Sequence, residues 1–352
     1  MTWTLDKLFD VVLDRSASDV ALVPGAPPTL WVHGEMYRLD APELTGDEVR
    51  EVFFPLLDPR ELEHLRREGD LDFSRGRERA GRFRINLHRQ RGSFSAALRF
   101  VPDHPPAFDE LKLPERVLEL AELPRGLVLV TGRTGSGKST TLAAMIQHIN
   151  RTSARHIITL EDPIEYTFSH ERSIIEQREI GLDCPSFVSA LRHVVRQRPD
   201  AILVGEMRDL ETISAALTAA ETSCLVLASL HTVSATETVN RIVDAFPANQ
   251  QEQVRVQLAD TLQGVLCQML FRDEIDATMV PAAEILLTNA AVRRAIRDNE
   301  THLLAGMIET GRGAGMQGMD AAIAILATEG RIAAGEALAK AHNPERLART
   351  LV

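Results

Sequence analysis

The residues from Gly132 to Ser139 have types and a spacing that suit one kind of chemistry, the binding of phosphate groups. They follow the pattern G-x-x-x-x-G-K-[ST], in which glycines let the backbone curl so that its N–H groups point at phosphate oxygens. In such a loop Lys138 reaches the β- and γ-phosphates of a nucleoside triphosphate, and the Ser139 hydroxyl ligates Mg²⁺. We therefore expect ATP and Mg²⁺ as ligands. The residues expected around the phosphates are Gly132, Arg133, Thr134, Gly135, Ser136, Gly137, Lys138, Ser139 and Thr140.

Acidic residues follow two further apolar runs, where they are costly to bury unless they are paired or face a metal ion. One run ends at Glu206, and beside a phosphate loop such an acid lies next to the bound Mg²⁺ or its water. The other leads into Glu161, Asp162 and Glu165. One of these three acids could orient the water that attacks the γ-phosphate, which requires hydrogen-bond reach. Spacing alone leaves the choice among the three open.

A histidine ends another apolar run. His231 follows Leu225–Ala228 closely. A histidine at the end of a strand is more often structural than catalytic. Because this strand belongs to the sheet that binds the nucleotide, we interpret His231 as a sensor of the γ-phosphate. It would gain or lose a hydrogen bond to that phosphate when ATP is hydrolysed.

These residues need a common scaffold, and the pattern between about 113 and 270 predicts one. Apolar runs without alternation suit strands buried on both faces of a mainly parallel sheet, and helical patterns separate them. We therefore predict an α/β fold with a phosphate-loop core. The predicted strands are Leu127–Val130, Ile157–Leu160, Ile202–Val204 and Leu225–Ala228, and the helices include Thr140–Ile149, Phe187–Val195 and Leu210–Ala220.

The rest of the chain predicts two flanking regions. Residues 1–103 mix short helical and strand patterns, which indicates a small α+β domain, and a proline-containing linker covers 104–112. The core then spans 113–270, and residues 271–352 have the pattern of a helical appendage.

Composition narrows the classes of function. Acidic residues outnumber basic ones by 50 to 39, so the net charge of −11 opposes electrostatic adhesion to nucleic acid. The three cysteines form neither a C-x-x-C pair nor a zinc pattern. We find no signal-peptide core and no apolar run of about 18 residues, so we expect no membrane span. Two rival classes stay open: a nucleic-acid translocase that shares this core, and a scaffold that binds ATP without appreciable turnover.

Four motifs in order resemble the signature of the secretion ATPase superfamily: GRTGSGKSTT, ITLEDPIEY, AILVGEMRDLET and ASLHT. Within this superfamily the chain is similar to type IV pilus retraction ATPases of the PilT type (twitching motility proteins). The similarity extends to residues 81–102, to Ala291–Asp298, and to Gly315, Met316, Gln317 and Asp320. It covers essentially the whole chain. It implies a RecA-like core, a PAS-like N-terminal domain and a helical C-terminal region.

The resemblance also implies roles for individual residues. Glu165, in the second motif, would be the catalytic base. Glu206 would be the Walker B acid of the third motif and His231 the histidine of the fourth, alongside Lys138. Arginines would reach the nucleotide of a neighbouring subunit, where such a residue stabilises charge on the transferred phosphoryl group. The arginine candidates are Arg82, Arg84, Arg99, Arg192 and Arg196.

The family further implies a homo-hexameric ring in the cytoplasm, at the cytoplasmic face of the inner membrane. There it would act on a pilus platform protein, and ATP hydrolysis would drive pilus disassembly. Arg133 replaces the usual proline of the loop, and Ala291–Asp298 matches only in part. That drift leaves open a paralogue of the retraction motor (PilU-type), another secretion ATPase, or joint action with a paralogue. The absence of a four-cysteine zinc module argues against extension motors and type II secretion ATPases.

Overall fold

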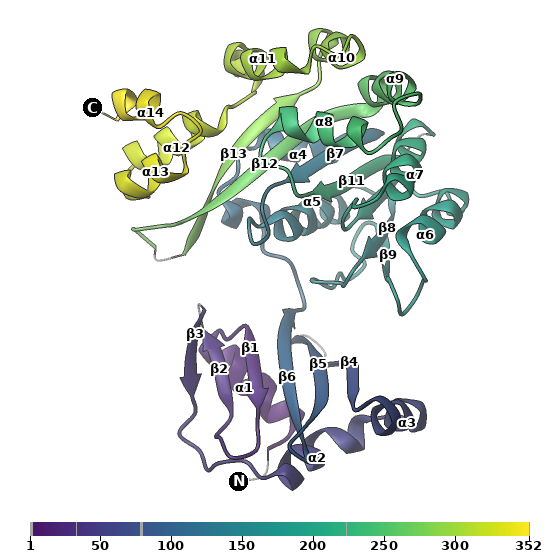
Figure 1. Cartoon of the computed structure of the whole chain (residues 1–352), viewed down its shortest axis with the longest axis vertical. Helices are drawn as coiled ribbons and strands as arrows, with labels where there is room; N and C mark the ends of the chain where they lie inside the picture. The colour runs from purple at the N-terminus through teal and green to yellow at the C-terminus, as the bar shows by residue number, and fades with distance from the viewer. Residues whose placement is uncertain (1–2, 33, 78–79, 223, 277, 352) are drawn as a thin grey trace. The chain divides into compact units, whose positions relative to one another are not determined.

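The computed structural model describes residues 3–32, 34–77, 80–222, 224–276 and 278–351. The chain divides into two compact units. The first contains Met1–His104 together with Glu165–Thr167, and the second contains Pro105–Ile164 and Phe168–Val352. Figure 1 labels the helices and strands of both units.

The first unit is an antiparallel sheet with helices, and its strand order is β3-β2-β1-β6-β5-β4. Its core contains Phe9, Phe53 and Phe83 among a larger number of aliphatic side chains. In β5 the apolar residues alternate with polar ones, so one face of the sheet is buried and the other carries arginines. The strands are β1 (Asp19–Leu22), β2 (Thr29–Val32), β3 (Glu35–Arg38), β4 (Asp70–Arg77), β5 (Gly81–Gln90) and β6 (Ser93–Pro102), and the helices are α1 (Leu5–Arg15), α2 (Gly46–Phe53), η1 (Phe54–Leu56) and α3 (Pro59–Glu68).

The second unit is built on a seven-stranded sheet in the order β13-β12-β7-β11-β10-β8-β9. All neighbouring strands are parallel except β12 and β13, which form an antiparallel hairpin at one edge. The strands are β7 (Gly126–Thr131), β8 (His156–Glu161), β9 (Ile174–Glu179), β10 (Ala201–Val204), β11 (Leu225–Leu230), β12 (Leu262–Arg272) and β13 (Met279–Leu287). This mainly parallel sheet confirms the predicted α/β fold class.

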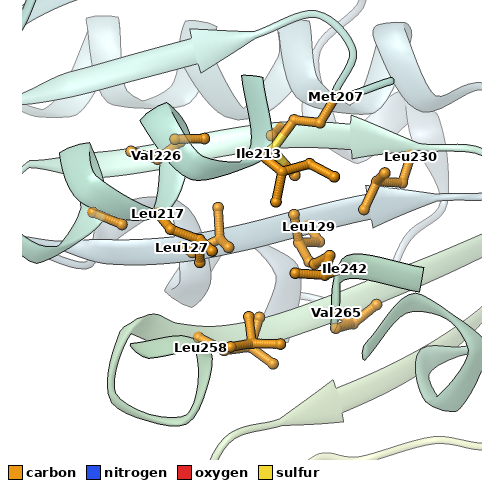
Figure 2. Close-up of a cluster of buried hydrophobic side chains, with 14 of the residues drawn as sticks. Leu127, Leu129, Met207, Ile213, Leu217, Val226, Leu230, Ile242, Leu258 and Val265 are labelled. Atoms are coloured by element: carbon orange, nitrogen blue, oxygen red, sulfur yellow. The ribbon is translucent and has the colours of Figure 1, made fainter. Parts of the chain in front are cut away.

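Helices cover both faces of this sheet. On one face α4 (Arg116–Glu122) and α5 (Lys138–Thr152) pack against the strands, with η2 (Phe108–Leu111) beside them. On the other face lie α6 (Phe187–Val194), α7 (Leu210–Glu221), α8 (Ala235–Asp244) and α9 (Gln251–Thr261). Figure 2 shows this second layer, where Leu217 of α7 and Leu258 of α9 meet Leu127 and Leu129 of β7. A short helix, η3 (Val195–Gln197), follows α6.

The order of the strands places four chain segments at one edge of the sheet. The carboxyl ends of parallel strands share an edge, and β7, β11, β10 and β8 are consecutive neighbours. In register, Thr131 pairs with Leu230, and Val204 pairs with both Ala228 and Leu160. The segments that follow these strands therefore emerge side by side.

The region after 271 differs from the helical prediction, which is wrong for Met279–Leu287. These residues form β13 because their apolar side chains continue the buried face of β12. Pro281 lies in this edge strand, where a missing N–H is tolerated. Near the other end of β13, Ile285 exchanges two backbone hydrogen bonds with Gln317, at 2.7 and 3.1 Å.

Helices make up most of the remaining C-terminal region. They are α10 (Ala290–Arg297), η4 (Thr301–Leu303), α11 (Leu304–Thr310), η5 (Gly311–Ala314), α12 (Met319–Thr328), α13 (Ala334–Lys340) and α14 (Pro344–Thr350). The last three pack on the β12–β13 hairpin in one apolar cluster. None of the helices in the described residues combines the length and apolarity that crossing a membrane requires.

Candidate nucleotide-binding site

The loop from Gly132 to Gly137 joins β7 to α5, and its backbone conformation explains its glycines. Gly132, Gly135 and Gly137 have φ values of 140°, 78° and 87°, a region that L-residues with side chains rarely adopt. A Cβ at Gly132 would also overlap the backbone carbonyl oxygen of Gln268. At Gly135 the corresponding space is open. The loop thus has the curled backbone that phosphate binding needs, at the start of a 15-residue helix.

Lys138 is the cation of this loop. It is 8% exposed, and its Nζ donates to the carbonyl oxygens of Gly132 at 3.0 Å and Arg133 at 3.1 Å. The same Nζ lies 3.4 Å from Nδ1 of His231, which comes from the neighbouring strand β11. Lys138 is therefore positioned by the loop backbone and also faces the end of the next strand.

Glu206 and His231 are brought together, as parallel neighbours at one sheet edge should be. His231 Nε2 lies 2.9 Å from Oε1 of Glu206. An ammonium group can only donate, so His231 Nδ1 accepts from Lys138 and its proton lies on Nε2, which donates to Glu206. Arg208 binds the other carboxylate oxygen of Glu206 at 2.7 Å. A continuous chain of hydrogen bonds thus joins Lys138, His231, Glu206 and Arg208.

The protonation of Glu206 follows from these contacts. Burial raises the pKa of Glu206, but hydrogen bonds from Arg208 and His231, with the positive charge of Arg208, outweigh it and hold the pKa below its ordinary value. Glu206 is therefore a carboxylate at neutral pH. Sequence reasoning missed Arg208, although its position two residues after the acid was a usable signal.

The three acids after β8 do not have the same environment. Glu161 is buried, and its Oε1 accepts from Thr159 Oγ1 at 2.6 Å and from Gln177 Nε2 at 3.2 Å. Asp162 and Glu165 are exposed. Glu165 belongs by its contacts to the first unit. Glu161 therefore has partners within the sheet that suit a structural role, and the two exposed acids are the accessible ones.

The arginine candidates fall into two groups. Arg84 and Arg99 lie directly opposite each other in β5 and β6 of the first unit, and Arg82 lies on the same face of β5. Arg99 also pairs with Asp19 at 2.9 Å. Two arginines facing each other across strands repel one another, an arrangement that favours an anion between them.

The second group is in the second unit. Arg192 in α6 and Arg196 in η3 are both exposed. Within the described parts of the chain, neither of them forms an ion pair.

The side chains around the loop fit a magnesium nucleotide. Ser139 is exposed in the first turn of α5. Ser136 Oγ is buried and has no hydrogen-bond partner among the described residues. No cluster of three His, Cys, Asp or Glu suited to a metal occurs in the part of the chain that the structure describes. At nucleotide sites Mg²⁺ needs few protein ligands, because phosphates and water complete its coordination shell.

The chain is similar to known proteins of one family over most of its length. The model of the family "Type II/IV secretion system protein" matches residues 108–321. The chain is 43% identical to a twitching motility protein of Neisseria gonorrhoeae, over 91% of this chain and 86% of the relative. It is 40% identical to the type IV pilus retraction ATPase PilT of Pseudomonas aeruginosa, over 94% and 96%. The type IV pilus ATPase PilU of that organism is 36% identical, over 97% and 90%.

A solved structure is also similar. The crystal structure of the pilus retraction motor PilT with bound ADP superposes with a TM-score of 0.91 at 44% identity, and the match covers 99% of both chains.

Proposed function

The chain belongs to the type II/IV secretion system protein family, and we propose that it is an ATPase motor that powers retraction of type IV pili. The observation that carries the proposal is the hydrogen-bonded chain from Lys138 through His231 to Glu206, which joins the phosphate loop to the acid at the next strand end. The chain is 40–43% identical to retraction proteins over most of its length, which supports pilus retraction as the work that ATP hydrolysis drives.

Each residue of the site has a proposed task. Gly132–Thr140 bind the phosphates of ATP, and Lys138 exchanges its carbonyl partners for phosphate oxygens. Mg²⁺ would be held by Ser139 and, through water, by Glu206, and it would neutralise charge that develops on the phosphates. His231 orients the Glu206 carboxylate and senses the γ-phosphate. Glu165 accepts the proton of the attacking water.

The mechanical part of the proposal requires more than one copy. We propose that six copies form a closed ring, since a heterologous interface that closes gives a ring. Arginines of a neighbouring copy would stabilise the transferred phosphoryl group, and the facing pair Arg84 and Arg99 are the strongest candidates, with Arg82, Arg192 and Arg196 as alternatives. Binding and release of the γ-phosphate would then switch the first unit between two arrangements.

The place of action follows from the same proposal. The ring would work in the cytoplasm at the inner membrane, against a platform protein of the pilus. A PilU-type role, alone or beside a second retraction ATPase, is the second candidate, and the 36% identity to PilU over 97% of the chain favours it.

Hydrolysis is tested with matched variants of the acidic segment. Purified wild type should release phosphate from ATP, and Lys138→Ala and Glu165→Gln should each reduce the rate at least a hundredfold, about 2.7 kcal/mol. Asp162→Asn is the control, because Asp162 is an exposed acid of the same segment. Normal hydrolysis by Glu165→Gln would remove Glu165 from the catalytic role, and normal hydrolysis by Lys138→Ala would refute the site.

Retraction is tested in cells. A deletion strain should keep abundant surface filaments that no longer shorten, and twitching should return only with a copy that hydrolyses ATP. Loss of the filaments would indicate a role in assembly instead. Normal twitching would point to a redundant or PilU-type role. The native mass of the ATP-bound protein tests the ring, and a monomer at working concentration would refute it.

A further inference from the structure

Glu284 is a buried carboxylate apart from the nucleotide-binding residues. It bonds to the start of α8, and its chain neighbours Ala283 and Ile285 bond to Gln317, which precedes α12. It lies in β13 and is 8% exposed. One carboxylate oxygen accepts a 2.7 Å hydrogen bond from the backbone N–H of Ala235, the first residue of α8. The backbone N–H of Met319, the first residue of α12, also faces this carboxylate. Burial raises the pKa of Glu284 above its ordinary value, and the N–H groups at the two helix starts oppose this shift.

The start of α8 continues the segment that contains the site histidine. Only three residues separate His231 from Ala235. The turn between them lies against the β12–β13 hairpin, where Cys267 and Glu284 are cross-strand neighbours. Cys267 Sγ contacts the carbonyl oxygen of Thr232 at 3.7 Å, and Glu284 holds the end of the turn. Because this turn is short and bonded at its end, a shift of His231 is passed to Ala235.

The start of α12 is attached just as closely. Gln317 pairs with Ile285 through the backbone, and its side-chain Nε2 donates to the carbonyl oxygen of Ala283 at 2.9 Å. In the first turn of α12, Asp320 accepts a 2.7 Å hydrogen bond from the backbone N–H of His342. This bond attaches the segment between α13 and α14 to α12. The last three helices also share one apolar cluster. Movement of the start of α12 is therefore carried into all three.

We propose that Glu284 is a positioning residue for ATP hydrolysis, which ties the histidine segment to the start of α12 so that His231 and the C-terminal helices change position together. The inference rests on the proposed function, since it takes His231 to respond to the γ-phosphate. It adds that the C-terminal helices read the state of the nucleotide through one carboxylate. The carboxylate of Glu284 bonds to the backbone of Ala235, and the backbone beside Glu284 bonds to Gln317, so Glu284 acts through the segments it joins.

The test compares Glu284→Gln with a matched carboxylate in the same hairpin. Glutamine keeps the size of the side chain but sets an NH₂ donor where an oxygen accepts. We expect the KM for ATP to stay within about twofold, because the phosphate loop is untouched, and kcat to fall about tenfold or more. The control is Asp273→Asn. Asp273 is fully buried and binds Lys112 and Arg331, away from the histidine segment, and this variant should keep the wild-type kcat.

Amide hydrogen exchange of α12 is a second measurement. If Glu284 only capped helices, its substitution would not change how this exchange depends on the bound nucleotide. In the wild type, the amides of α12 should exchange at different rates when the protein holds a non-hydrolysable ATP analogue and when it holds ADP. In Glu284→Gln this difference should disappear while both nucleotides still bind. If that variant does not fold, Glu284→Asp keeps the carboxyl group, is one methylene shorter, and should show a weaker form of both effects.

Three results would overturn the inference. They are a wild-type kcat in Glu284→Gln, equal exchange of α12 in the two nucleotide states of the wild type, and a nucleotide-dependent difference that survives in the variant. Each leaves the proposed function standing as long as the wild type hydrolyses ATP. A wild type that releases no phosphate would refute the proposed function, and this inference with it.

Discussion

The two ring nitrogens of His231 make different contacts, and substitution can separate them. Asparagine at this position places its amide near the position of Nδ1, which faces Lys138 at 3.4 Å. Glutamine extends to the position of Nε2, which donates to Glu206 at 2.9 Å. Both contacts have a charged partner, and the second is 0.5 Å shorter, so it is the stronger bond. We predict that His231→Gln retains more ATPase activity than His231→Asn.

The size of the effect follows from the exposure of the pair. A hydrogen bond to a charged group contributes about 1.5–3 kcal/mol net. The side chain of His231 is 43% exposed and that of Glu206 is 18% exposed, so solvent screening reduces the value to about 1–2 kcal/mol. At about 1.36 kcal/mol for each factor of ten in rate, His231→Asn should lower kcat roughly 5- to 30-fold.

The assay is phosphate release at saturating ATP, with KM measured in parallel. KM should change little, because the loop that binds the phosphates is not altered. A second histidine–glutamate pair provides the control: His148 Nε2 lies 2.9 Å from Glu122 Oε1, and His148→Asn should leave kcat unchanged. Equal activity of His231→Asn and His231→Gln, or activity of both at the wild-type level, would refute the assigned roles of the two nitrogens.

Three other expectations follow from the structure. Gly132→Ala forces a side chain into φ 140° and against the carbonyl oxygen of Gln268, so about 1–3 kcal/mol of strain should weaken ATP binding roughly 5- to 150-fold in equilibrium titrations. Arg208→Ala removes a group that lowers the pKa of Glu206, so the acid side of the pH–rate profile should move to higher pH; an unchanged profile would contradict this. Leu217→Ala should destabilise the second unit by about 2–5 kcal/mol in urea unfolding, because this side chain is 1% exposed in the packed layer of Figure 2.

Much of the central sheet could be predicted because its strands are buried on both faces. A continuous apolar run such as Leu127–Val130 is typical of a strand buried on both faces. The strand in the structure, Gly126–Thr131, is longer than the predicted one by one residue at each end. Three strands were missed. Leu262–Arg272 follows α9 with no residue between them, so no turn signal marks its start. The two strands at the edges were missed because they lack continuous apolar runs. Ile174–Glu179 is mostly polar, and Met279–Leu287 contains a proline, so neither has the pattern of a buried strand.

The candidate site was predictable where its chemistry lies in consecutive residues. The loop around Lys138 is one such segment, and its backbone has the expected form. The contact between Lys138 and His231 joins positions 93 residues apart, and it depends on β7 and β11 being neighbours. The pairing of Glu206 with Arg208 depends on how the chain turns after β10, which spacing does not specify.

The β12–β13 edge of the central sheet restricts how copies of this chain can join. Pro281 removes an N–H from the outer strand, and Gln317 occupies backbone groups near the other end of that strand. Both features oppose the addition of a strand from another subunit at this edge. Contacts between side chains are therefore favoured at this border, and such contacts can separate and re-form without breaking a ladder of main-chain hydrogen bonds.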